Sequence, residues 1–228
     1  MNIYDNYKSI IDSINEKALK CSRDPHSIKV VAVSKTFSSD TVQEAVNSGI
    51  NLFGENKIQE AKNKIPLIKG DFEFHMVGHL QSNKSKDAVK LFSLIHSIDS
   101  LSTAEKLNRE AENSAKIQNI LIQINSSGED TKSGISPDQA VDLAGSIIEL
   151  KNLNLKGIMT IGPLTDTISD IIKSFSLTAK TMERINRELS INLTEISMGM
   201  SDDYLIAIEE GSTLVRIGSA IFGGRSYQ

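Results

Sequence analysis

The sequence predicts a single (β/α)8 barrel of the TIM type, preceded by an extra amino-terminal helix. Short β-branched runs alternate with segments of helical periodicity along the whole chain, and eight such strand and helix units follow one another. The runs are apolar without alternation, which is typical of parallel strands buried on both faces. A chain of 228 residues has the length of one such barrel. Eight equal units favour a closed barrel over an open doubly wound sheet, and we expect one domain over residues 1–228.

The amino-terminal segment has the pattern of an amphipathic helix. From Ile3 to about Cys21 the apolar residues recur at helical spacing. The period changes at Lys29–Ser34, a β-branched run that predicts the first strand. Further strands are predicted at 51–54, 73–77, 93–98, 119–124, 155–161, 193–198 and 213–218, and helices at 41–47, 57–65, 83–90, 103–116, 137–150, 169–189 and 203–210.

Short motifs support several of these helix boundaries. Ser102–Glu105 and Ser136–Gln139 have the spacing of capping boxes at helix amino termini, and Pro137 suits the first turn of the second of these helices. Glycine is expected just past the end of two other helices, at Gly49 and Gly211.

Composition and charge exclude several classes of partner. The net charge of -4 comes from interleaved acidic and basic residues, so no basic surface is expected for nucleic acid or anionic lipid. Cys21 is the only cysteine, which excludes an internal disulfide and a multi-cysteine zinc site. No apolar run approaches the length of a membrane span. His75 and His79 are four residues apart, a spacing that would place both on one face of a strand, but without a third ligand no metal site is expected. We expect a cytoplasmic protein, monomeric or weakly dimeric, whose main partners are small molecules.

Two loops at one end of the predicted barrel have the chemistry of a phosphate site. In such barrels phosphate is often bound by the loops after strands seven and eight, here Met198–Asp203 and Gly218–Ala220. Each loop offers backbone N–H groups, a hydroxyl and a helix amino terminus, and Ser201 is expected to cap the next helix. Either loop alone could be an ordinary tight turn, but the pair favours phosphate binding. Asp202 and Asp203 would repel a phosphate, so we expect both to point outward.

Lys35 and Arg216 are expected near these loops. Lys35 follows the first strand, and barrel closure makes the first and eighth strands neighbours. On its own such a lysine usually reaches into solvent. Arg216 lies among apolar residues in the last strand, where its guanidinium needs a partner; an ion pair and a ring nitrogen are equally good candidates. A nearby cation favours the neutral amine that can attack an aldehyde. Other polar residues at strand ends could face the same mouth or cap helices: Glu55, Asn56, His79 and Gln81.

Ordered blocks of the chain match one known family. They are 31–36 (VAVSKT), 53–56 (FGEN), 77–84 (VGHLQSNK), 132–134 (KSG), 157–160 (GIMT), 197–203 (SMGMSDD) and 215–223 (VRIGSAIFG). Through them the sequence resembles, nearly end to end, the pyridoxal phosphate (PLP) homeostasis proteins, a family similar to the barrel domain of alanine racemase.

This resemblance implies a complete cofactor site. Lys35 would hold PLP as a Schiff base, Arg216 would face the pyridine nitrogen, and Ser201 with the Gly218–Ser219 turn would hold the phosphate. Residues after the second and third strands would lie near the cofactor. The expected cofactor-binding residues are Lys35, Asn56, His79, Met200, Ser201, Arg216, Gly218 and Ser219.

The family resemblance implies a role in PLP supply and in amino-acid and keto-acid balance, without a settled catalytic activity. An arginine opposite the ring nitrogen disfavours aminotransferase chemistry. Racemization needs a second base, which in alanine racemase is a tyrosine of the partner subunit. The tyrosines of this chain, Tyr4, Tyr7, Tyr204 and Tyr227, are poorly placed for that role. The first hypothesis is therefore reversible PLP binding and delivery to apoenzymes. The alternatives are a weak PLP-dependent amino-acid racemase and a sugar-phosphate isomerase without PLP.

Overall fold

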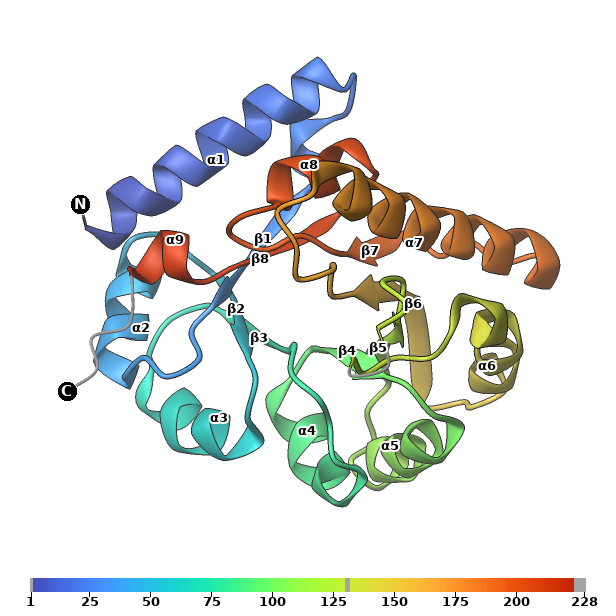
Figure 1. Cartoon of the computed structure of the whole chain (residues 1–228). Helices are drawn as coiled ribbons and strands as arrows, with labels where there is room; N and C mark the ends of the chain where they lie inside the picture. Colours follow the sequence, from blue (N-terminus) through green and yellow to red (C-terminus); the bar gives the residue numbers. More distant parts are fainter. Residues whose placement is uncertain (1, 130–131, 224–228) are drawn as a thin grey trace.

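The computed structural model describes residues 2–129 and 132–223, and within them eight parallel strands close into a barrel (Figure 1). The strands pair in chain order, and β1 (Lys29–Val33) pairs in parallel with β8 (Leu214–Ile217) to close the barrel. The predicted (β/α)8 architecture is confirmed. The other strands are β2 (Leu52–Glu55), β3 (Glu73–Met76), β4 (Leu94–Ile98), β5 (Gln118–Ile124), β6 (Leu153–Thr160) and β7 (Glu195–Ser197).

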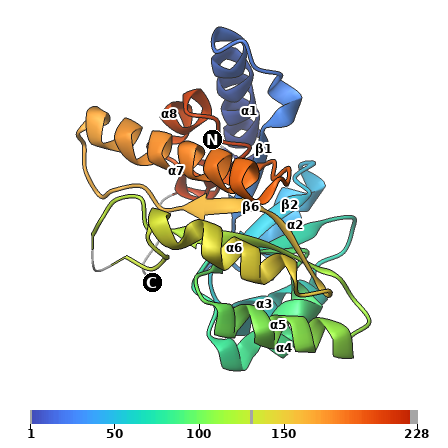
Figure 2. The same ribbon diagram turned by 90° about the vertical axis from the view of Figure 1, so that its right-hand side faces the viewer.

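Helices surround the barrel, and none in the described ranges is long and apolar enough to cross a membrane (Figures 1 and 2). The extra helix α1 (Ile3–Lys20) lies against the two helices that follow β7 and β8. The Asn6 amide donates to the carbonyl of Ile221 at 2.9 Å, and Arg23 donates to the carbonyl of Ser212 at 2.8 Å. The helix therefore packs against the two helices that follow the loops predicted to bind phosphate. The remaining helices are α2 (Ser39–Asn47), α3 (Ile58–Lys64), α4 (Ser85–Leu91), α5 (Leu101–Asn113), α6 (Ala140–Ile148), α7 (Ile168–Leu189), α8 (Tyr204–Glu209) and α9 (Ser219–Phe222).

The predicted helix boundaries are confirmed at one capping box and corrected at the other. Ser136 and Gln139 form the predicted box at the 3-10 turn before α6. Helix α5 begins earlier than expected, because Ser100 has extended backbone and accepts a hydrogen bond from the N–H of Thr103 at 3.4 Å. Ser102 therefore already lies inside the helix and is not its cap.

The barrel interior contains both apolar and polar side chains. Strand side chains point alternately inward and outward, so Val31 and Val33 pack inside with residues from neighbouring strands. The same alternation carries Lys35 and Gly218 inward, just beyond the ends of β1 and β8. Buried polar side chains inside the barrel include His75, His96, Ser197 and Arg216.

Candidate functional site

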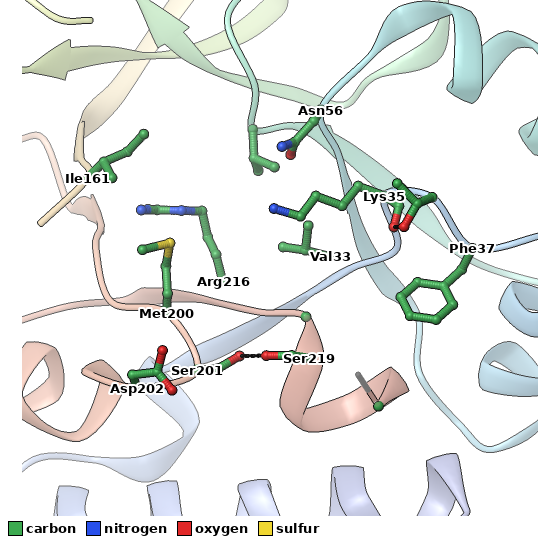
Figure 3. Close-up of a pocket in the computed structure, with 14 residues that line it drawn as sticks. Val33, Lys35, Phe37, Asn56, Ile161, Met200, Ser201, Asp202, Arg216 and Ser219 are labelled. Atoms are coloured by element: carbon green, nitrogen blue, oxygen red, sulfur yellow. Dashed lines mark hydrogen bonds between the residues drawn. The ribbon is translucent and has the colours of Figure 1, made fainter. Parts of the chain in front are cut away.

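A cavity of about 350 Å³ opens at the carboxyl ends of the strands (Figure 3). Its size is in the lower part of the range typical of small-molecule sites. It is bordered by the ends of β1 and β8 and by the loops after β2, β6 and β7. Most of the residues predicted from the sequence line it together: Lys35, Asn56, Met200, Ser201, Arg216, Gly218 and Ser219.

His79 does not line this cavity. Its side chain is 55% exposed, and its Nδ1 atom lies 3.7 Å from a carboxylate oxygen of Asp99. The preceding residue, Gly78, packs closely on the loop after β2: a Cβ atom there would come within 2.3 Å of the Asn56 carbonyl oxygen. The backbone after β2 thus lies against the backbone after β3, where Val77 lines the cavity and His79 does not. His79 borders a separate depression on the outer side of Asn56.

The chain turns sharply at Lys35 through an uncommon backbone conformation. Thr36 has a φ of +69°, in the left-handed region that β-branched residues rarely adopt. Its N–H donates to a carboxylate oxygen of Glu60 at 3.0 Å, and its hydroxyl donates to the Lys35 carbonyl at 2.5 Å. The N–H of Phe37 donates to the Ser34 carbonyl at 3.1 Å. These bonds hold a strained turn that directs Lys35 into the cavity.

A buried ion pair lies beneath this turn. Glu55 and Lys64, hereafter the anchor pair, have side chains that are 0% and 7% exposed and bond directly to each other. The Lys64 ammonium also donates to the Ser34 carbonyl at 2.8 Å. The other carboxylate oxygen of Glu55 accepts from the N–H of Asn56 at 3.2 Å. The anchor pair therefore joins the ends of β1 and β2 on which Lys35 and Asn56 are carried.

Sequence reasoning considered Glu55 only as a cavity or capping residue and missed Lys64. A signal for Lys64 was present in the spacing of α3. Ile58, Ala61 and Lys64 are three residues apart, and all three are buried on the same side of the helix.

The loops after β7 and β8 meet at two hydroxyl groups. Ser219 Oγ donates to Ser201 Oγ at 3.1 Å (Figure 3). Gly199 makes the first loop possible, since its φ is +90° and a Cβ atom there would lie 2.6 Å from the Cβ atom of Ala207. The N–H of Arg216 donates to the Gly199 carbonyl at 2.9 Å and ties this loop to β8.

Two expectations about this loop are wrong. Ser201 does not cap α8, because Asp203 occupies the residue before the helix. Asp203 does not point outward either: its carboxylate turns back and accepts from the N–H of Met200 at 2.6 Å, which satisfies an otherwise free donor. Burial raises the pKa of the Asp203 carboxyl above its ordinary value. Asp202 is exposed, as expected, although it borders the cavity.

Arg216 is 5% exposed and is held by two neutral acceptors. Its guanidinium donates to Ser197 Oγ at 2.7 Å and to the carbonyl of Thr160 at 2.8 Å. Its hydrogen-bond partners are neutral, and within the described ranges no carboxylate forms an ion pair with it, although Asp203 acts on its pKa through space; the ion-pair alternative is therefore wrong for this part of the chain. Burial lowers the pKa of Arg216 to about 10, which leaves it charged at neutral pH. A guanidinium has five donor hydrogens, and Arg216, which uses two of them in these bonds, lines the cavity.

Below Arg216, the three residues Ser197, His96 and His75 form a hydrogen-bonded chain, hereafter the inner relay. Ser197 Oγ lies 2.9 Å from His96 Nδ1, and His96 Nε2 lies 3.0 Å from His75 Nδ1. Burial and the charge of Lys29 lower the pKa of His75 to about 3, and burial holds that of His96 well below its ordinary value. Both rings are therefore neutral at neutral pH.

Sequence reasoning missed Ser197 and His96 and considered His75 only as a metal ligand. The structure separates His75 from His79, and the described residues contain no group of three or more metal-ligating side chains. The inward alternation along the strands could have placed His75, His96 and Ser197 inside the barrel.

Comparisons with known proteins agree with this architecture. Residues 13–226 match the family model described as alanine racemase, N-terminal domain. The chain is 34% identical to the pyridoxal phosphate homeostasis protein of Aquifex aeolicus over 100% of both chains. It is 39% identical to the protein of the same name in Escherichia coli strain K12, over 99% of this chain and 98% of that protein. The solved structure of PipY from Synechococcus elongatus with PLP bound has a TM-score of 0.82 and 32% identity, covering 92% of this chain and 100% of that one.

Proposed function

This chain belongs to the pyridoxal phosphate homeostasis protein family, and we propose that it binds PLP in the cavity at the carboxyl ends of the strands and delivers it to PLP-dependent apoenzymes. The observation that carries the proposal is the convergence on one cavity of a lysine amine, a buried guanidinium and a pair of hydroxyls. The proposed place of action is the cytoplasm, as a monomer or weak dimer.

The residues of the cavity fit the functional groups of PLP. The hydroxyls of Ser201 and Ser219, with the backbone at Gly218, form a polar pocket for the phosphate. Arg216 offers donors to the pyridine nitrogen and keeps it unprotonated. Lys35 extends into the cavity from the opposite wall (Figure 3). The carboxylate of Asp202 opposes the phosphate, but it lies in solvent, where water and salt weaken the repulsion.

Lys35 is proposed to hold PLP by a reversible covalent bond. The Lys35 amine adds to the aldehyde carbon, a C=N bond forms, and the aldehyde oxygen leaves as water with the two amine hydrogens. Water reverses the step and releases PLP. When bound in this way, PLP can stabilise a carbanion, but use of that property needs bases in the protein.

The position of the tyrosines supports a carrier rather than a racemase. Among the described residues no tyrosine lines the cavity. Tyr4 and Tyr7 lie on α1, with Tyr7 packed on the core, and Tyr204 begins α8. Tyr227 lies outside the described residues. A racemase would therefore lack a second tyrosine base in the described part of this chain.

The absorbance spectrum of the protein mixed with PLP tests the covalent bond. We expect a visible imine band that borohydride removes, with PLP then fixed to the peptide that contains Lys35. Lys35→Ala should lose the band, and Lys86→Ala, at an exposed lysine on α4, should keep it. A band of full intensity in Lys35→Ala would refute the role of Lys35.

Delivery is tested with the loaded protein and an apoenzyme that needs PLP. Both samples contain an excess of a competing amine that traps free PLP. In its presence the apoenzyme should recover activity faster with the loaded protein than with the same total amount of PLP added free. Recovery no faster than with the free PLP would exclude delivery. Chiral analysis after long incubation with alanine or serine tests racemization, and turnover above the Lys35→Ala control would favour the racemase instead.

A further inference from the structure

The inner relay connects the cavity to the opposite end of the barrel. Its first member, Ser197, accepts a hydrogen bond from Arg216, which lines the cavity. Its last member, His75, lines a second cavity of about 260 Å³ at the amino ends of the strands, together with Lys29 and Glu73. The residues of the relay lie on β7, β4 and β3, so their contact depends on barrel closure and not on local sequence.

The donors and acceptors that these groups can provide determine which atom donates in each hydrogen bond of the inner relay. Arg216 can only donate, so Ser197 Oγ accepts from it. Ser197 is 0% exposed, and its own proton needs a buried acceptor, which His96 Nδ1 supplies. The proton of His96 then lies on Nε2 and is donated to His75 Nδ1. Each ring is thereby fixed in the Nε2–H tautomer.

We propose that Ser197, His96 and His75 are positioning residues for the part of the site that binds the pyridine ring of PLP. They hold the Arg216 guanidinium in the orientation that presents its donors to the pyridine nitrogen. This inference rests on the proposed function, because it assigns Arg216 to PLP. The relay acts through Arg216 alone and does not touch the ligand.

The charge distribution supports this role. Arg216 carries a buried charge, the two acceptors that hold it are neutral, and the carboxylate of Asp203 acts on its pKa only through space. Burial holds the pKa of both histidines far below neutrality, so the relay supplies dipoles that accept from Arg216 without adding charge. The relay thus orients the guanidinium without neutralising its charge.

Substitution of Ser197 tests the proposal with a matched control on β4. Ser197→Ala removes one of the two acceptors of Arg216 and its link to the histidines, and the dissociation constant for PLP should rise about tenfold. Ser97 is also a buried serine, 1% exposed, but its hydroxyl has no hydrogen-bond partner in the described structure. Ser97→Ala should therefore leave the dissociation constant within about twofold of wild type. Equal affinities for wild type and Ser197→Ala would overturn the proposal.

A second background separates positioning from a general structural effect. In Arg216→Met the relay has nothing to orient, so adding Ser197→Ala or His96→Leu should cause no further loss of PLP affinity. A further loss in that background would show that the relay acts independently of Arg216. Thermal unfolding of each variant identifies any that fails to fold. If His96→Leu fails to fold, the comparison is made with Ser197→Ala alone, in the wild-type and in the Arg216→Met background.

Nuclear magnetic resonance of ¹⁵N-labelled histidine tests the relay without PLP. The chain has four histidines, and His26 is exposed and serves as the reference. We expect His75 and His96 to be neutral Nε2–H tautomers at pH 7, and PLP to shift both signals. The opposite tautomers, or a charged ring, would overturn the proposed direction. If wild type shows the expected tautomers but no PLP binding, the proposed function fails; if it binds PLP but Ser197→Ala has no effect, only the positioning role fails.

Discussion

The two walls of the cavity hold their cationic side chains in different ways. On the β1 side, the backbone around Lys35 is fixed by the Thr36 turn and by the anchor pair beneath it, while the lysine side chain extends freely into the cavity (Figure 3). On the β8 side, the side chain of Arg216 is itself held by two acceptors and supported by the inner relay. A lysine that forms and breaks a covalent bond needs mobility, whereas an arginine that orients a ring needs a fixed direction. The difference fits those two roles.

The anchor pair should give the largest effect on stability. Lys64→Met leaves the buried carboxylate of Glu55 unpaired, and we expect the free energy of unfolding to fall by about 3–5 kcal/mol. Lys62→Met on the same helix breaks an exposed pair with Asp87 and should cost at most about 1 kcal/mol. Urea denaturation measures both. Equal losses would mean that the β1 wall does not depend on the anchor pair.

The neutral His75 of the inner relay should make the free energy of unfolding sensitive to acid. The pKa of His75 is about 3 in the folded protein, below its ordinary value of 6.5, so between these values the unfolded chain binds a proton that the folded protein does not. Stability therefore falls as the pH falls from about 6.5 toward 3, by roughly 2 kcal/mol between pH 7 and pH 5 for this ring.

The variant His75→Gln isolates this contribution. It should show a shallower fall in the free energy of unfolding from pH 7 to pH 5 than wild type, whatever its stability at pH 7. His26→Gln, at an exposed ring, provides the control and should follow the wild-type slope more closely than His75→Gln does. Parallel curves for wild type and His75→Gln would contradict a neutral His75.

The sequence predicted that Lys35 and Arg216 line the cavity, because the positions of both residues follow from local patterns. A β-branched run ending in lysine, and an arginine at an inward position of the last strand, are visible in single segments. Most of the predicted cavity residues follow from these strand ends and from the loops after β7 and β8. Their roles in holding PLP remain predictions.

What the sequence did not reveal depends on contacts between distant segments. His96 and Ser197 are 101 residues apart, and only barrel closure brings them together. His79 lies 3.7 Å from Asp99, a residue after the next strand, and outside the cavity. Asp203 was misplaced for a local reason: an aspartate before a helix can point outward or turn back to a free N–H, and the structure adopts the second arrangement.

The smallest expected effect concerns the strained turn, and it distinguishes stability from cofactor retention. Thr36→Gly removes the strain of a left-handed threonine, while glycine loses more backbone entropy on folding, so a net gain of only about 0.5 kcal/mol in unfolding free energy is expected. Ser190 has a similar φ of +53° at the end of α7, and Ser190→Gly should gain a comparable amount. Only Thr36→Gly should hasten PLP release, because the backbone of this turn holds Lys35 in the cavity. Stopped-flow measurement of PLP dissociation compares the two variants. If they release PLP at the same rate, the turn does not fix Lys35, and the distinction between the two walls depends on the anchor pair alone.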